Sequence, residues 1–156
     1  EIDEIIREKK KNNKSKCAFC SRLRRGHLYT FASENKFTKI ALGHHREDAN
    51  ETLLMNMFFS GRLKGMAPLL HSDNGCNVVI RPLIYTAEAD IACYAQYMKV
   101  PIIHESCIPE AESHRALVKK LICELEETHQ DISNNMISAQ KRITPSHLLD
   151  PAYFSD

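Results

Sequence analysis

The sequence predicts an α/β protein built on a partial parallel sheet, with helices concentrated toward its C-terminal end. Short runs of β-forming residues at Lys39–Leu42, Asn77–Leu83 and Val100–Ile103 alternate with longer segments of helical periodicity. Turn residues separate them, with Gly43 directly after the first run. Three strands are few for a doubly wound sheet, so we expect an N-terminal part of the fold to lie outside these 156 residues.

Apolar residues at helical spacing predict five helices. They are Ser21–Asn35, Glu47–Phe59, a helix that Thr86 caps and that ends near Met98, Glu110–Thr128 and Ile132–Arg142. We expect residues 1–16 to be a mobile basic lead-in, residues 17–150 to be one domain portion, and residues 151–156 to be a tail. Cys93 and Cys123 fall inside helical patterns, and we interpret both as small buried residues.

Composition excludes several classes of protein. No apolar run is long enough to span a bilayer, so we expect no membrane partner. No signal-peptide pattern is present, and the six cysteines without one favour a reducing, cytoplasmic setting over a disulfide scaffold. The net charge of +1 is uninformative, but residues 7–25 hold nine Lys or Arg and one acid. That distribution indicates either a phosphate-binding face or an ordinary solvated one.

Polar residues follow the first predicted strand, in the segment 42–52 with sequence LGHHREDANET. Ligands of open α/β sheets bind at the carboxyl ends of the strands. Asp48 and Glu51 are three residues apart, and Glu47 and Glu51 four apart, so each pair shares one helical face. These spacings indicate a ligand site at the start of a helix, whose N–H groups can also hold an anion. A capped helix with surface acids is the alternative.

Cysteine spacing indicates a metal site. Cys17 and Cys20 form a C-x-x-C pair that can face one metal from a turn. Zinc and iron–sulfur clusters take three or four ligands, and Cys107, after the third predicted strand, is the best third candidate. His104 and His114 are the nearest candidates for a fourth. A redox-active pair is the rival interpretation.

Basic residues accompany the cysteine pair and a glycine-flanked loop. We expect these side chains to bind phosphates: Arg22, Arg24, Arg25, Arg62 and Lys64.

Several strings, taken in order, make the chain resemble the tRNA 2-thiocytidine biosynthesis family of the PP-loop ATPases. They are CAFCSRLRRG, KIALGHHREDANETLLMNMFFSGRLKGMAP, VVIRPLIY, VPII followed by Cys107, and ITPSHLLD. The resemblance runs over roughly Cys17 to Asp150. The family's S-G-G-K-D-S phosphate loop lies upstream of its C-x-x-C, and no such string occurs in these residues.

The resemblance implies an adenine-nucleotide α-hydrolase fold and a tRNA sulfurtransferase. Such enzymes use ATP and Mg²⁺ to adenylate the C2 oxygen of cytidine 32 in the tRNA anticodon loop, and sulfur then replaces that oxygen. A 4Fe–4S cluster held by three cysteines delivers the sulfur, which a cysteine desulfurase supplies. A homodimer is also implied. Because the phosphate loop is not in these residues, we expect the chain to be inactive alone.

Carried over position by position, the resemblance assigns roles to specific residues. The cluster ligands are Cys17, Cys20 and Cys107. The catalytic residues are Asp48 and His44, and the nucleotide site also takes Gly43, His45, Glu47 and Thr52.

Two alternatives remain open. One is another PP-loop tRNA-modifying enzyme, of the 2-thiouridine or lysidine type. The other is a non-catalytic RNA-binding module stapled by zinc.

Overall fold

The structure is a computed structural model that describes residues 16–72, 75, 77–102 and 113–153. The chain divides into two compact units. Unit 1 takes the chain up to Leu42 together with Pro68–Arg81, and unit 2 takes Gly43–Ala67 together with Pro82–Asp156. The lead-in predicted for residues 1–16 lies outside the described residues apart from Lys16, and the division into lead-in, domain portion and tail stays a prediction.

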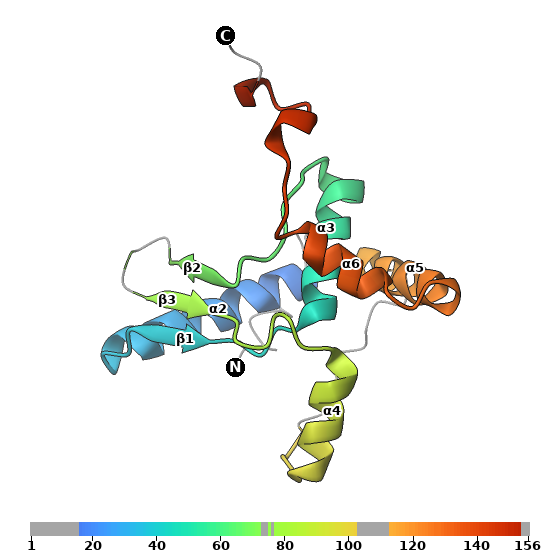
Figure 1. Cartoon of the computed structure of the whole chain (residues 1–156). Helices are drawn as coiled ribbons and strands as arrows, with labels where there is room; N and C mark the ends of the chain where they lie inside the picture. Colours follow the sequence, from blue (N-terminus) through green and yellow to red (C-terminus); the bar gives the residue numbers. More distant parts are fainter. Residues whose placement is uncertain (1–15, 73–74, 76, 103–112, 154–156) are drawn as a thin grey trace. The chain divides into compact units, whose positions relative to one another are not determined.

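Unit 1 is a small mixed sheet with one long helix (Figure 1). The helix is α2 (Lys16–Glu34), and the strands are β1 (Lys39–Ala41), β2 (Leu69–His71) and β3 (Val78–Ile80), in the order β1-β3-β2. β1 pairs with β3 in parallel, with Ile40 opposite Val79. β2 pairs with β3 in the antiparallel sense. The α/β prediction and its parallel pairing are therefore confirmed, within a sheet that is mixed overall.

The third predicted strand is wrong in its described part. Residues 100–102 form no strand, and Ile103 lies outside the described residues. The third strand of the sheet is β2, which the sequence interpretation placed in an irregular stretch between a loop and a turn. β2 and β3 are arms of a hairpin: the Ser72 amide donates to the Asn77 carbonyl at 2.9 Å, and the Asn77 amide donates to Ser72 Oγ at 3.0 Å. These bonds close the hairpin, so the strand that precedes β3 in the chain pairs along its edge.

The core of unit 1 is modest. Ala32 of α2 and Val79 of β3 are its buried apolar residues, and α2 packs against β1. The buried Asn77 side chain donates from Nδ2 to the Phe37 carbonyl at 2.7 Å. This bond links the hairpin to the segment between α2 and β1. It also gives the buried amide group the hydrogen-bond partner that it needs.

Unit 2 is helical. Its helices are α3 (Arg46–Ser60), α4 (Glu88–Tyr97), α5 (His114–Thr128) and α6 (Ile132–Ala139), followed by the 3-10 turns η1 (Pro145–His147) and η2 (Pro151–Tyr153). α3 packs against α5 and α6, which also contact each other (Figure 1). Ala49 of α3 and Val118 and Ile122 of α5 are buried there, whereas α4 buries none of its residues.

Helix boundaries differ from the prediction at several ends. α2 begins at Lys16 rather than Ser21, α6 ends at Ala139 rather than Arg142, and residues 110–112 lie outside the described residues. Thr86 is not the cap of α4, since Ala87 holds that position. The Thr86 carbonyl instead accepts the Arg46 amide at 3.0 Å, which joins the approach to α4 to the start of α3.

The expected burial of Cys93 and Cys123 is also wrong, because both thiols are exposed. α4 has no covered face that could bury Cys93, and Cys123 lies on a side of α5 that borders a pocket. No helix within the described ranges is long and apolar enough to cross a membrane.

Candidate functional site

The acidic segment predicted to be a site lies at the N-terminus of α3, with His45 as the N-cap residue. The His45 amide donates to Asp48 Oδ2 at 3.1 Å. Its ring lies between two carboxylates, with Nδ1 3.1 Å from Glu47 Oε2 and Nε2 3.4 Å from Asp48 Oδ2. Three of the residues assigned to the nucleotide site are therefore in mutual contact.

Glu47 joins two helices. Its Oε1 accepts from Arg46 Nη2 at 2.7 Å, and its Oε2 accepts the backbone amide of Glu88, the first residue of α4, at 2.8 Å. Burial by itself would raise the pKa of Glu47, but the hydrogen bonds from Arg46 and the Glu88 amide outweigh it and lower the pKa. Glu47 is thus a charged carboxylate that fixes the start of α4.

Asp48 and Glu51 share one cation from α5. Arg115 Nη2 lies 3.5 Å from Asp48 Oδ1, and its Nε lies 3.1 Å from Glu51 Oε2. One guanidinium contacts both side chains, which confirms the predicted common face. Glu51 is only 5% exposed. Desolvation raises its pKa, against the opposing effect of Arg115 and Lys119.

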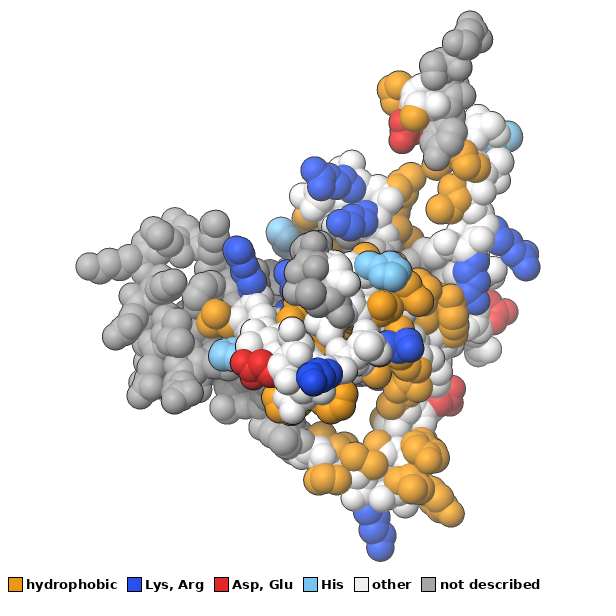
Figure 2. Space-filling model, turned by 90° about the vertical axis from the view of Figure 1, so that its left-hand side faces the viewer, with side chains coloured by type: hydrophobic (Ala, Val, Ile, Leu, Met, Phe, Trp, Pro, Cys, Tyr) orange, Lys and Arg blue, Asp and Glu red, His pale blue; other side chains and the backbone are white. Residues whose placement is uncertain are grey.

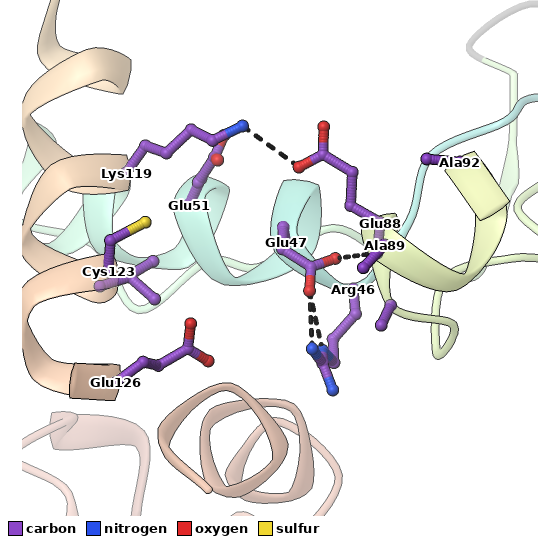
Figure 3. A pocket seen from close by; sticks show the side chains of 11 residues that line it. Arg46, Glu47, Glu51, Glu88, Ala89, Ala92, Lys119, Cys123 and Glu126 are labelled. Carbon is purple, nitrogen blue, oxygen red and sulfur yellow. Dashed lines mark hydrogen bonds and ion pairs between the residues drawn. The ribbon is translucent and has the colours of Figure 1, made fainter. Parts of the chain in front are cut away.

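A pocket of about 470 Å³ opens beside these groups (Figure 3). Its polar lining includes Glu47, Glu51, Glu88, Lys119 and Glu126, and Cys123 lies at its side. Lys119 Nζ is 3.1 Å from Glu88 Oε2, and this hydrogen bond raises the pKa of Lys119. The pocket has more carboxylates than cations, so it does not suit an anion.

The donors at the start of α3 are largely engaged. The Arg46 amide donates a hydrogen bond to the Thr86 carbonyl, and the His45 amide donates one to the Asp48 carboxylate. A phosphate would have to compete for these donors, whereas the carboxylates suit a hard cation such as Mg²⁺. Within the described ranges no three His, Cys, Asp or Glu side chains are placed to hold one metal ion. A Mg²⁺ ion here would need further oxygens, such as those of nucleotide phosphates.

The remaining residues assigned to the nucleotide site lie on either side of this cluster. Gly43 and the half-buried His44 precede the helix, and the half-buried Thr52 lies further along it. A Cβ built on Gly43 would meet no atom of the described residues within 4 Å. Packing inside unit 2 therefore does not require glycine at this position.

The expected cluster ligands are only partly described. Cys17 and Cys20 both lie on α2, three residues apart, and the Cys20 thiol is free and half-buried. Residues three apart on a helix lie on one side of it, so the backbone is compatible with two thiolates facing one metal. Cys107 and His104 lie outside the described residues.

The basic residues are all accessible. Arg22, Arg24 and Arg25 are exposed on α2 in unit 1, and Arg62 and Lys64 are exposed on the loop after α3 in unit 2. Gly61 ends α3 in the left-handed conformation, with φ of +60°. Asn56 Nδ2 of α3 donates to the Lys64 carbonyl at 2.6 Å, so the helix itself holds this basic loop.

Sequence analysis missed the residues that organise the site from a distance. Arg115 and Lys119 received no role from the sequence, although their i, i+4 spacing puts them on one face of α5. Asn50, which is 0% exposed, donates to the Ser133 carbonyl at 3.0 Å and accepts from Gln140 Nε2 at 3.1 Å. A polar residue at a core position of the α3 pattern was the signal that could have revealed it.

The mixed sheet of unit 1 and the helices of both units define an α/β protein. The family model described as the PP-loop domain matches residues 2–126. The chain belongs to this PP-loop family, and its fold is that of the PP-loop ATPases.

Curated relatives from two organisms are similar to almost the whole of this chain. The chain is 52% identical over 147 residues to a tRNA-cytidine(32) 2-sulfurtransferase of Deinococcus radiodurans, covering 94% of this chain and 49% of the relative. It is 49% identical over 151 residues to the enzyme of the same name from Chromohalobacter salexigens, covering 96% and 53%. The chain therefore spans about half the length of the curated relatives it matches.

The fold also resembles that of the U34-tRNA thiolase NcsA from Methanococcus maripaludis, a structure that contains its 4Fe–4S cluster. The TM-score is 0.68 at 22% identity, over 87% of this chain and 46% of that one. At this identity the likeness establishes the fold alone.

Proposed function

We propose that the chain is part of a tRNA-cytidine(32) 2-sulfurtransferase. The observation that carries this proposal is the 52% identity over 147 residues to the Deinococcus radiodurans enzyme of that name. In this proposal the enzyme activates the C2 oxygen of the cytidine with ATP, and sulfur replaces it. Activation is needed because a carbonyl-type oxygen is a poor leaving group until it carries a phosphoryl substituent.

The N-terminus of α3 is proposed to bind the nucleotide. Asp48 and His44 are assigned catalytic roles, and Gly43, His45, Glu47 and Thr52 surround the nucleotide. The engaged donors of the helix favour a role in holding Mg²⁺ over direct binding of phosphate. Glu47 supports this role because its pKa is lowered, which keeps it anionic at neutral pH. Mg²⁺ would neutralise charge that develops on the phosphates.

Cys17, Cys20 and Cys107 are the proposed ligands of a 4Fe–4S cluster. The spacing of Cys17 and Cys20, three residues apart on α2, supports the assignment, because positions at that spacing share one side of a helix. Three protein ligands leave one iron of such a cluster free to bind sulfur. The exposed arginines of α2 follow the pair directly and would hold RNA phosphates close to it.

The proposed partners follow from the reaction. The substrate is the tRNA anticodon loop, whose unpaired bases are the usual target of sequence-specific recognition. Arg22, Arg24, Arg25, Arg62 and Lys64 are the proposed phosphate contacts. A cysteine desulfurase is the proposed sulfur source, and we propose a homodimer in the cytoplasm.

A U34-type thiolase is the second candidate, favoured by the fold of the M. maripaludis structure. The two candidates modify different nucleosides, and mass spectrometry of digested tRNA separates them. The chain and a matching full-length enzyme would be incubated anaerobically with tRNA, ATP, Mg²⁺, iron and sulfide. We expect 2-thiocytidine with the full-length enzyme, and its loss in the Asp48→Asn variant. A 2-thiouridine product, or no thiolated nucleoside from the full-length enzyme, would overturn the proposal.

A further inference from the structure

Three aromatic side chains gather where the C-terminal end of α3 meets the N-terminal end of α5. The rings of Phe59 and His114 are stacked, with centroids 3.7 Å apart and an interplanar angle of 6°. The Phe58 ring meets Phe59 edge-on, with centroids 6.4 Å apart and planes at 90°. These two contacts fix the orientation of all three rings, which together form a small rigid surface.

This aromatic surface is open to solvent. Phe58 is 52% exposed, Phe59 is 41% exposed, and His114 is also exposed. Stacking covers the face of Phe59 that His114 contacts, and the rest of Phe59 lies at the surface together with Phe58 and His114. Hydrophobic side chains are widely visible at the surface in Figure 2, but ordered aromatic stacking is particular to this cluster among the described residues.

Two basic residues, Arg62 and Lys64, follow the aromatic pair along the chain. Gly61, with φ of +60°, turns the chain back at the end of α3, and the Arg62 amide donates to the Asn56 carbonyl at 3.1 Å. The bond from Asn56 Nδ2 to the Lys64 carbonyl holds the next part of the loop. Arg62 and Lys64 therefore project from a fixed loop that begins directly after the aromatic pair, and both are exposed.

We propose that Phe58, Phe59 and His114 form a stacking platform for an unpaired base of an RNA loop, with Arg62 and Lys64 holding the adjoining phosphates. Every nucleobase has an apolar face that stacks on aromatic rings, and the backbone beside it carries charge that basic side chains neutralise. The platform rests on the proposed function, since the tRNA anticodon loop is the RNA it would receive.

The other exposed aromatic side chains offer a contrast. Tyr94 and Tyr97 of α4 are 64% and 82% exposed. The helix that carries them begins with Glu88 and Asp90 in its first turn, and it has no basic residue in its last turn. Lys99 follows Tyr97 by two residues, whereas Asp90 precedes Tyr94 by one helical turn, and its charge repels phosphate. Tyr94 is therefore the matched control: an exposed aromatic residue in the same unit with an acid one turn away.

The test uses an RNA hairpin with 2-aminopurine at single positions of a seven-nucleotide loop. Stacking quenches 2-aminopurine fluorescence. We expect the wild-type chain to quench at least one loop position. We expect Phe58→Ala and His114→Ala to abolish that quench and to weaken binding about tenfold. Phe58→Tyr should restore both, and Tyr94→Ala should leave both unchanged.

Salt dependence separates stacking from phosphate contacts. Removing phosphate contacts reduces the slope of log affinity against log salt, whereas removing a stacked ring leaves the slope intact. We expect Phe58→Ala to lower affinity at an unchanged slope, and Arg62→Ala with Lys64→Ala to lower the slope.

Each failure has its own signature. Unchanged affinity and quench in Phe58→Ala and His114→Ala, with salt-dependent binding by the wild type, would overturn the platform alone. The same unchanged affinity and quench are expected if a segment of protein, rather than an RNA base, covers the rings of Phe58, Phe59 and His114. No binding of tRNA or hairpin by the wild-type chain would overturn the platform, while thiolation by the full-length enzyme would keep the proposed function.

Discussion

At the scale of single residues, the pairing of Arg115 with Glu51 supports the whole acidic site. Glu51 is buried and Arg115 Nε is its ion-pair partner at 3.1 Å. We expect Arg115→Ala to destabilise the fold by ~1–3 kcal/mol, because a buried carboxylate loses its partner. Urea unfolding would measure this loss.

The neighbouring Lys120 provides the comparison. It is exposed and pairs with Glu124 at 3.7 Å, an i, i+4 contact on the surface of α5. Lys120→Ala should change stability by no more than ~0.5 kcal/mol. Adding Glu51→Gln to Arg115→Ala should recover part of the loss, since the buried charge is removed. Equal effects of the two alanine substitutions would contradict the role given to Arg115.

Glu47 and Glu51 should give opposite pH dependences of stability. The pKa of Glu51 is raised in the fold, so its contribution is complete below the unfolded value of about 4.5 and is lost as pH rises through the folded pKa. The pKa of Glu47 is lowered, so its contribution is present above 4.5 and is lost as pH falls through the folded pKa.

Unfolding free energies of three proteins across the acid range would test both signs. As pH rises toward about 4.5, wild type should gain stability relative to Glu47→Gln. As pH rises further, above about 4.5, wild type should lose stability relative to Glu51→Gln. Parallel curves for the two variants would show that the carboxylates share one environment, contrary to the structure.

At the scale of elements, the C-terminal end of α3 depends on one glycine. Gly61 has φ of +60°, which costs a non-glycine residue ~1–2 kcal/mol. We expect Gly61→Ala to lower the melting temperature accordingly. Gly43→Ala is the control, because Gly43 lies outside the left-handed region and its added Cβ would meet no described atom within 4 Å. A loss of nucleotide binding by a stably folded Gly43→Ala chain would support close approach of a ligand there.

The basic loop and α6 meet at Gly65. A Cβ on Gly65 would lie 2.5 Å from Gln140 Oε1, and Gln140 Nε2 donates to the buried Asn50 at 3.1 Å. Gly65→Ala should therefore push Gln140 away from Asn50 and cost ~1–3 kcal/mol. The substitution should cost much less in a Gln140→Ala background, because the clash and the hydrogen bond are already gone. Additive losses in this double-mutant cycle would contradict the contact.

At the scale of the whole molecule, the sequence predicted what local patterns determine. The β1 run, the core of α3, the long α5 and the common face of Asp48 and Glu51 follow from periodicity and turn residues over a few positions. The strand β2 was missed because three residues carry no measurable alternation, and its pairing depends on the hydrogen bonds between Ser72 and Asn77. Contacts such as Asn50 with Gln140 join residues far apart in sequence, so only packing creates them.

The last prediction concerns the metal content of the chain. Anaerobic reconstitution with iron and sulfide should give about four irons per chain, with the visible absorption of an iron–sulfur cluster. Serine at Cys17, Cys20 or Cys107 should lower the iron count, whereas Cys93→Ser and Cys123→Ser should not. The last two are exposed thiols, neither of which has a second cysteine at ligand spacing. A colourless chain that binds zinc instead would favour an RNA-binding module stapled by the same C-x-x-C pair. Unchanged iron uptake in the Cys17→Ser and Cys20→Ser variants would show that α2 supplies no ligand to the cluster. The proposal that sulfur is delivered next to the arginines of α2 would then lose its basis.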